Sequence, residues 1–227
     1  MKGHGTGLLR ERTRVAFTRI ALPALIMTGL CTAAVAAGSG TAAPRITANI
    51  DEANLAAAGS VAPLALPAYD QGAVQDNMAL EHVLLQLRRS PEQAAALDGL
   101  LQAMQDPHSA SYHKWLTAEA LGEEFGAAQA DIDTVTRWLG SHGLHVNMVH
   151  KNALTMDLSG TAGQIREAFH TEIHNYLVNG QQHIANATVP QIPAALSPVV
   201  AGLVSLHDFH PHPMMTRPKN NFTFTCT

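Results

Sequence analysis

The sequence has 227 residues, of which 46% are hydrophobic and 14% are charged, and its formal net charge is -4. A chain of this length has room for one ordinary domain with extensions, because domains typically hold about 100 to 200 residues. The apolar content permits a packed core and excludes a wholly disordered chain.

The first 37 residues have the order of a secretory signal peptide, in which basic residues precede an apolar run and small residues follow it. The run extends from Ile20 to Val35, and Val35 and Ala37 satisfy the small-residue rule for cleavage. A membrane anchor is the alternative, but Pro23 and Gly29 interrupt the run, and a spanning helix needs roughly 20 apolar residues. We expect residues 1–37 to be removed on export, leaving no stable membrane anchor.

Residues 38–227 carry nine Lys and Arg against 17 Asp and Glu, a formal charge of -8. Such a surface repels the phosphates of nucleic acids, and no basic helix or patch argues the other way. Cys226 is the one cysteine of this part, so no disulfide can form within it. Nucleic acid is therefore excluded as a partner, and stability must come from the core.

Residues 38–75 are rich in Ala, Gly, Ser and Pro, so we expect a flexible linker there and assign no fold to it. Residues 78–87 favour a strand, with a helix as the alternative. Ser90, Pro91 and Gln93 form a capping box that predicts the start of a helix reaching Gln105. Apolar residues at spacings of three and four predict that one face of this helix lies in the core. They are Ala94, Leu97, Leu101 and Met104.

From Thr117 onward, helix and strand signals alternate. Thr117 and Thr161 are expected to cap helices, and Asn179-Gly180 predicts a tight hairpin because both residues tolerate positive backbone angles. Pro211, Pro213 and Pro218 loosen the C-terminal segment, and residues 213–227 are expected to form a disordered tail. The expected helices are 117–125, 130–141 and 161–169, and the expected strands are 144–149, 153–158, 171–178, 183–185 and 199–206. Thr161 and Gln164 have the spacing of a capping box. The residues expected on the inner faces of the last two helices are Ile132, Val135, Leu139, Ala162, Ile165 and Phe169.

This order of elements predicts an α+β fold, an antiparallel sheet with helices on one face, over residues 76–212. A β-α-β-β-α-β arrangement, the ferredoxin-like sandwich, fits it. Fold class alone does not indicate function.

The sequence has no G-x-S-x-G, H-E-x-x-H, C-x-x-C or glycine-rich phosphate motif. Ser159-Gly160-Thr161 resembles a nucleophile loop, but a turn leading into a helix cap explains it as well. Glu119 and Glu123 share a helical face and could form an acid pair, although a solvated helix face is the simpler interpretation. We expect no catalytic residue, no cofactor and no metal site.

Thirteen histidines are many for this length, and His207, His210 and His212 lie close together. Zinc requires three or four convergent ligands on a fixed frame, which a proline-rich tail does not offer, so only adventitious binding is expected. Twelve histidines follow residue 37, and their protonation between about pH 7 and pH 5 would reverse the sign of the net charge. Ordinary surface composition explains them equally well. If the change has a function, a partner held near neutral pH is released in acid.

The string from Asp106 to Thr117 reads DPHSASYHKWLT and resembles the D-P-x-S-x-x-Y-x-x-x-L-T signature of the pro-kumamolisin activation domain. This is the pro-region of sedolisin-type serine-carboxyl peptidases. Further matches, among them Phe125-Gly126, Trp138-Leu139 and Ile192-Pro193, extend the resemblance over about residues 77–210. The signature residues are Asp106, Pro107, Ser109, Tyr112, Trp115, Leu116 and Thr117.

The resemblance implies a ferredoxin-like, subtilisin-propeptide-like domain that assists folding of the peptidase and masks its active site until acid triggers processing. It implies no catalytic or calcium residue here, because the family's peptidase domain would follow this region. For the signature itself we expect a structural role, in which Tyr112, Trp115 and Leu116 pin the loop to the core. Direct contact with a peptidase is the alternative.

We therefore expect an exported monomer, secreted or periplasmic, whose partner is a cognate sedolisin-like catalytic domain. That partner is bound in cis in the family and would be bound in trans by a chain without the enzyme. A truncated gene product and a fragment of a precursor are two ways in which the chain could occur without its enzyme. The alternative function is a free-standing, exported α+β protein-binding module with no peptidase-related role.

Overall fold

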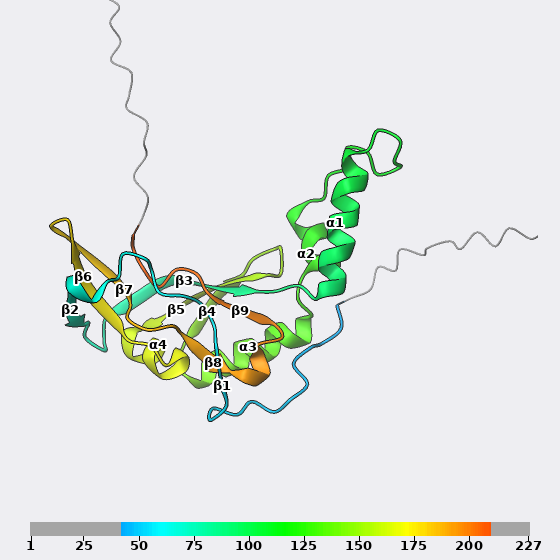
Figure 1. The fold of residues 1–227 in the computed structure, drawn as a ribbon. Coiled ribbons are helices and arrows are strands. Elements are labelled where there is room, and N and C mark those ends of the chain that lie inside the picture. Colours follow the sequence, from blue (N-terminus) through cyan, green and yellow to red (C-terminus); the bar gives the residue numbers. More distant parts are fainter. Residues whose placement is uncertain (1–41, 210–227) are drawn as a thin grey trace, which may run out of the picture. The chain divides into compact units, whose positions relative to one another are not determined.

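The computed structural model describes residues 42–209 (Figure 1). The expected signal peptide, 1–37, and the expected tail, 213–227, lie outside the described residues. Within residues 42–209, no helix is both long and apolar enough to span a bilayer.

The centre of the fold is a four-stranded antiparallel sheet with the strand order β4-β5-β3-β9. Its strands are β3 (Ala79–Leu87), β4 (His145–Val149), β5 (Thr155–Thr161) and β9 (Val200–Leu203). Together with α3 (Gln129–Ser141) and α4 (Ala162–Phe169), they follow one another as β-α-β-β-α-β. The first strand lies inside the sheet rather than at its edge, as in the ferredoxin-like arrangement. The predicted α+β fold is confirmed.

The core lies between this sheet and helices α3 and α4, which cover one of its faces (Figure 1). Alternate residues of β5 point into it, so that Met156 and Leu158 are fully buried, and Ile165 and Phe169 of α4 meet them. Trp138 of α3 packs edge-on against Phe169, with ring centroids 5.4 Å apart. The predicted inner faces of both helices are therefore confirmed, as is the capping box of Thr161 with Gln164.

Two further helices, α1 (Pro91–Gln105) and α2 (Ala118–Phe125), pack against each other ahead of α3. Both predicted caps are present, since Ser90 and Gln93 form a capping box and Thr117 accepts from the amide of Ala120. The predicted core face of α1 is wrong for most of its length: Met104 is buried, but Leu101 is 42% exposed. The spacing of the apolar residues correctly places them on one face of α1. That face stays largely exposed because only the short α2 packs against it.

A second sheet has the order β2-β6-β7 and consists of β2 (Asp70–Ala73), β6 (Ile173–Val178) and β7 (Gln181–Asn186). The predicted Asn179-Gly180 hairpin joins β6 to β7, and both residues have positive φ. Beside it, β1 (Leu55–Ala57) pairs with β8 (Gln191–Pro193). The 3-10 turns η1 (Pro67–Tyr69) and η2 (Ala194–Leu196) complete the described elements.

The expectation of a linker without a fold over residues 38–75 is wrong for the part that the structure describes. That part contains β1, η1 and β2, and it buries Ala58, Ala62 and Ala65. Small alanine side chains show no amphipathic period, but they allow the backbone to approach the rest of the domain closely. Composition therefore could not distinguish a linker from a strand whose partner, β8, lies more than 130 residues later.

Candidate functional site

The face of the four-stranded sheet that points away from α3 and α4 is not covered by any helix of the described chain (Figure 1). We call it the open face. Its residues alternate along β3 and β5 with the buried ones and are mostly polar. They include Leu84, Gln86, Thr155, Asp157 and Ser159.

A chain of hydrogen bonds, here called the polar row, crosses the open face. The Nδ1 atom of His82 lies 2.9 Å from Oδ2 of Asp157, and Oδ1 of Asp157 accepts from the Asn147 amide at 2.9 Å. The Oδ1 atom of Asn147 accepts from Ser159 Oγ at 3.0 Å and lies 3.1 Å from Nδ1 of His145. Three strands thus contribute to one connected group whose members hold one another in place.

The polar row contains a titratable pair. Its hydrogen bond to Asp157, aided by the negative charge of that carboxylate, raises the pKa of His82. The same hydrogen bond, followed by that from Asn147, lowers the pKa of Asp157. The pair is therefore a charged ion pair in acid and carries a net negative charge once His82 loses its proton.

The His82-Asp157 pair is not part of a nucleophilic triad in this arrangement. A triad needs a hydroxyl bonded to the free nitrogen of the histidine, whereas the hydroxyl of Ser159 donates to Asn147. Residues 42–209 also contain no cluster of three or more His, Cys, Asp or Glu side chains placed to hold a metal ion. Of the three histidines considered as ligands, His207 is described, and His210 and His212 lie outside the described residues.

Sequence reasoning missed the polar row, although β3 carried a signal for it. Two polar residues, Glu81 and His82, follow each other between Leu80 and Val83 and break the alternation of a strand. In the structure the register of β3 with β5 shifts at this point, and His82 has a φ of 56°. A bulge of this kind redirects a side chain, here toward Asp157.

The second candidate site is the signature loop, residues 106–117, which joins α1 to α2. Polar residues of the signature order its backbone. Asp106 accepts from the amide of His108 at 2.9 Å, Ser109 Oγ accepts from the amide of Ser111 at 3.1 Å, and Thr117 caps α2. Pro107 follows the helix end, as predicted.

The aromatic residues of the signature loop do not pin it to the core. Trp115 is 68% exposed and Tyr112 is 38% exposed, while Leu116 is half-buried. The ring of His113 stacks on that of Tyr112, with centroids 3.8 Å apart, and lies 5.9 Å from that of Trp115. The expectation that Tyr112 and Trp115 pin the loop to the core is therefore wrong, because both are exposed, and only polar signature residues bond the loop's own backbone.

Ser159, Glu119 and Glu123, which the sequence offered as further candidates, lie where a helix cap and an exposed helix face explain them. Ser159 belongs to β5, which continues to Thr161 and leads directly into α4. Glu119 and Glu123 are both exposed on α2, and Glu119 forms an ion pair with Lys151 of the β4-β5 turn. The interpretation of a helix cap and a solvated helix face describes them correctly.

Comparison with known proteins gives one family. The family model described as "Pro-kumamolisin, activation domain" matches residues 68–209. Sedolisin of Pseudomonas sp. is 29% identical over 135 residues, which are 59% of this chain and 23% of that protein. Xanthomonalisin of Xanthomonas sp. is 32% identical over 128 residues, 56% of this chain and 15% of that protein. Human tripeptidyl-peptidase 1 is 33% identical over 140 residues, 57% of this chain and 24% of that protein.

The matched region spans about a quarter or less of the length of these relatives. The family model, by contrast, covers more than half of the present chain and most of its described residues, those from residue 68 onward. It includes the four-stranded sheet with its polar row and the signature loop. The chain therefore belongs to the pro-kumamolisin activation domain family, the pro-region of sedolisin-type peptidases.

Proposed function

We propose that the chain is the activation pro-domain of an exported, sedolisin-like acid serine endopeptidase, secreted or periplasmic, which it inhibits and helps to fold. The observation that carries the proposal is the family match over residues 68–209. It is supported by the open face, a surface of the four-stranded sheet on which the described chain packs no helix of its own.

The open face suits a stable complex because its polar groups are already oriented. Asp157 and Asn147 satisfy each other and their neighbours, so a partner that covers them leaves few polar groups without a hydrogen bond. Such prior order reduces the entropy cost of association. A masking complex of this kind would bury about 1,200 to 2,000 Å² in total.

Release in acid follows from the His82-Asp157 pair if the partner covers it. Burial alone would keep the proton on His82, because neutral histidine would leave the buried Asp157 carboxylate without a counter-ion. The partner must therefore place a Lys or Arg side chain beside Asp157, which disfavours the charged form of His82. Binding would then expel the proton of His82, and added protons would favour the free chain. Release of the peptidase in acid would then depend on one residue, His82, rather than on the combined charge of twelve histidines.

Inhibition is tested by measuring the affinity of the purified chain for mature sedolisin at pH 7 and its effect on peptide cleavage in acid. Thr155→Arg places a large charge on the open face, at the start of β5, and should weaken binding at least about tenfold. Ala130→Arg is the control, since Ala130 is exposed on the helix layer. No binding of the unchanged chain to sedolisin or xanthomonalisin would favour the free-standing binding module instead.

The folding role needs a separate experiment. Mature sedolisin is denatured and diluted to refolding conditions at pH 7 with and without the purified chain, and the recovered activity is measured in acid. A folding helper raises the yield in proportion to the added chain, whereas Thr155→Arg should not. An equal yield with and without the chain would leave inhibition as its one role.

A further inference from the structure

The signature loop has two properties that bear on its role. Its aromatic side chains are exposed, yet its backbone is closely ordered. Besides the side-chain bonds of Asp106 and Ser109, the amide of His113 donates to the carbonyl of Met104 at 3.0 Å, and that of Tyr112 donates to Ser109 at 3.1 Å. An ordered loop without a binding role would gain stability by burying these rings.

The backbone at the aromatic stack is strained. His113 has a φ of 54°, in the left-handed region that a residue with a Cβ atom seldom adopts. Strain of this kind persists where the surrounding bonds enforce it and is concentrated at functional positions. Here it aligns the ring of His113 with that of Tyr112.

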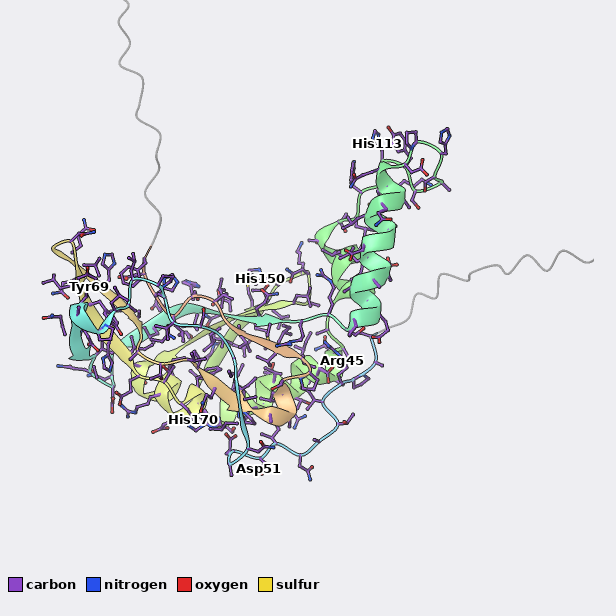
Figure 2. All side chains as sticks on the ribbon, viewed as in Figure 1. Arg45, Asp51, Tyr69, His113, His150 and His170 are labelled. Atoms are coloured by element: carbon purple, nitrogen blue, oxygen red, sulfur yellow. The ribbon has the colours of Figure 1, made fainter. Side chains whose placement is uncertain are left out.

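The loop is also held firmly relative to the sheet. Helix α2 packs on the β4-β5 turn so closely that a Cβ atom added to Gly122 would lie 2.1 Å from the carbonyl oxygen of Lys151. The amide of Ala127 donates to Ala153 of the same turn at 3.1 Å. Helix α1 then carries the loop about 22 Å from the end of β3, given its 15 residues and a rise of about 1.5 Å per residue. Figure 2 shows His113 at that far end.

We propose that Tyr112, His113 and Trp115 form a second contact point for the catalytic domain of a sedolisin-type peptidase, separate from the open face. This rests on the proposed function. The matched region is a quarter or less of each relative. The remaining three quarters of such a protein are therefore the partner that we assign to the loop. Figure 1 shows α1 rising on the side of the sheet away from α3 and α4, where a partner on the open face would lie.

The chemistry of the contact follows from the residues. Trp and Tyr are the side chains most enriched among those that dominate binding energy, because they bury much area and lose little side-chain entropy. We therefore expect an apolar depression on the peptidase that binds the ring of Trp115. Polar groups around it would bond the Tyr112 hydroxyl and the His113 imidazole.

Alanine variants test the contact. Trp115→Ala and Tyr112→Ala should each weaken binding of the chain to mature sedolisin at pH 7 by about tenfold or more. Tyr69→Ala is the matched control, because Tyr69 is 37% exposed against 38% for Tyr112 and lies far from His113 in the structure (Figure 2). The variants should unfold at the unchanged temperature, since the rings they lose contribute little to the core.

The outcomes separate the two proposals. If the unchanged chain does not bind sedolisin or xanthomonalisin, the proposed function fails and this inference fails with it. If the unchanged chain binds and Trp115→Ala binds equally well, the loop is not a contact and the proposed function stands.

A spectroscopic measurement checks the contact directly. The sequence has two tryptophans, Trp115 and Trp138, so a chain labelled with 5-fluorotryptophan gives two fluorine resonances that Trp115→Phe assigns. Addition of unlabelled sedolisin should shift the Trp115 resonance and leave the position of the buried Trp138 resonance unchanged. A Trp115 resonance that does not move in the complex would overturn the inference.

Discussion

The carboxylate of Asp131, in the first turn of α3, accepts hydrogen bonds from the backbone amide of Arg45, 86 residues earlier, at 3.0 and 2.9 Å. Oδ1 also accepts from the amide of Ile46 at 3.0 Å. Asp131 is 1% exposed, so these amides, together with the positive end of α3, compensate for burial of the carboxylate. The bond attaches the stretch before β1 to the core.

Asp131→Ala should destabilise the domain by about 1 to 3 kcal/mol, because it leaves the two amides without their acceptor. Asp133→Ala is the control: Asp133 lies two residues further along α3, is exposed, and should change stability by less than about 0.5 kcal/mol. Urea unfolding followed by circular dichroism measures both. Equal midpoints for the two variants would show that the stretch around Arg45 is not held by this bond.

Two glycines of the α1-α2 pair should respond to alanine with opposite signs. At Gly99, inside α1, a Cβ atom meets nothing within 4 Å, so Gly99→Ala should stabilise the helix by about 1 kcal/mol. At Gly122 the same atom meets the Lys151 carbonyl, so Gly122→Ala must separate α2 from the β4-β5 turn and destabilise the domain. Thermal unfolding of the two variants gives the signs directly. Stabilisation by Gly122→Ala would contradict the described packing.

The stability of the domain should rise from pH 8 to pH 6 through His174. Burial lowers its pKa, but hydrogen bonds to Asp70 and Glu172 outweigh burial and raise it above 6.5. A histidine whose pKa is raised by folding stabilises the fold fully below about pH 6.5, and this contribution is lost as the pH rises through the folded-state pKa.

The partner of His174 sets the lower limit of this range. The hydrogen bond from the amide of Gly72, with that of His174, lowers the pKa of Asp70 below 3.8, so its contribution disappears as the pH falls below that value. The pair should therefore stabilise the domain most between about pH 4 and pH 6.5. From pH 8 to pH 6 and 5, the free energy of unfolding should rise by up to about 1 kcal/mol in the unchanged chain and by less in His174→Gln. Identical pH profiles would exclude this pair as the cause.

The affinity for the peptidase should have the opposite pH dependence if His82 loses its proton on binding. Because the pKa of His82 in the free chain is raised by Asp157, the affinity should start to fall as the pH is lowered from 8, before pH 6.5 is reached. At lower pH the loss should approach tenfold for each unit by which the pH is lowered. His82→Gln should flatten this profile, whereas His170→Gln, an exposed histidine at the end of α4, should retain it. The comparison needs binding measurements with mature sedolisin between pH 8 and pH 5. A profile unchanged in His82→Gln would place the acid-sensitive group elsewhere.

Taken together, these two dependences predict dissociation of a folded domain in mild acid. The ion pair of His174 with Asp70 strengthens over the range in which protonation of His82 weakens the complex. The released chain should therefore retain its native circular dichroism at pH 5. Loss of that signal together with binding would indicate release by unfolding.

Local signals in the sequence predicted most element boundaries correctly, because they act over three or four residues. The capping boxes at Ser90 and Thr161, the Asn179-Gly180 hairpin and the inner faces of α3 and α4 all have this range. The signature in residues 106–117 likewise identified the family, because its residues are adjacent in the chain.

Only the tertiary structure decided which segments pack against each other. Whether the apolar face of α1 is covered, whether the alanines before β2 are buried and whether Trp115 meets the core all depend on partners far away in the chain. The polar row is the clearest case, since His82 and Asp157 lie 75 residues apart and meet only because β3 pairs with β5 through a bulge. Residue type and spacing determine how a segment folds locally, whereas its packing energy depends on the surface that the rest of the chain presents to it.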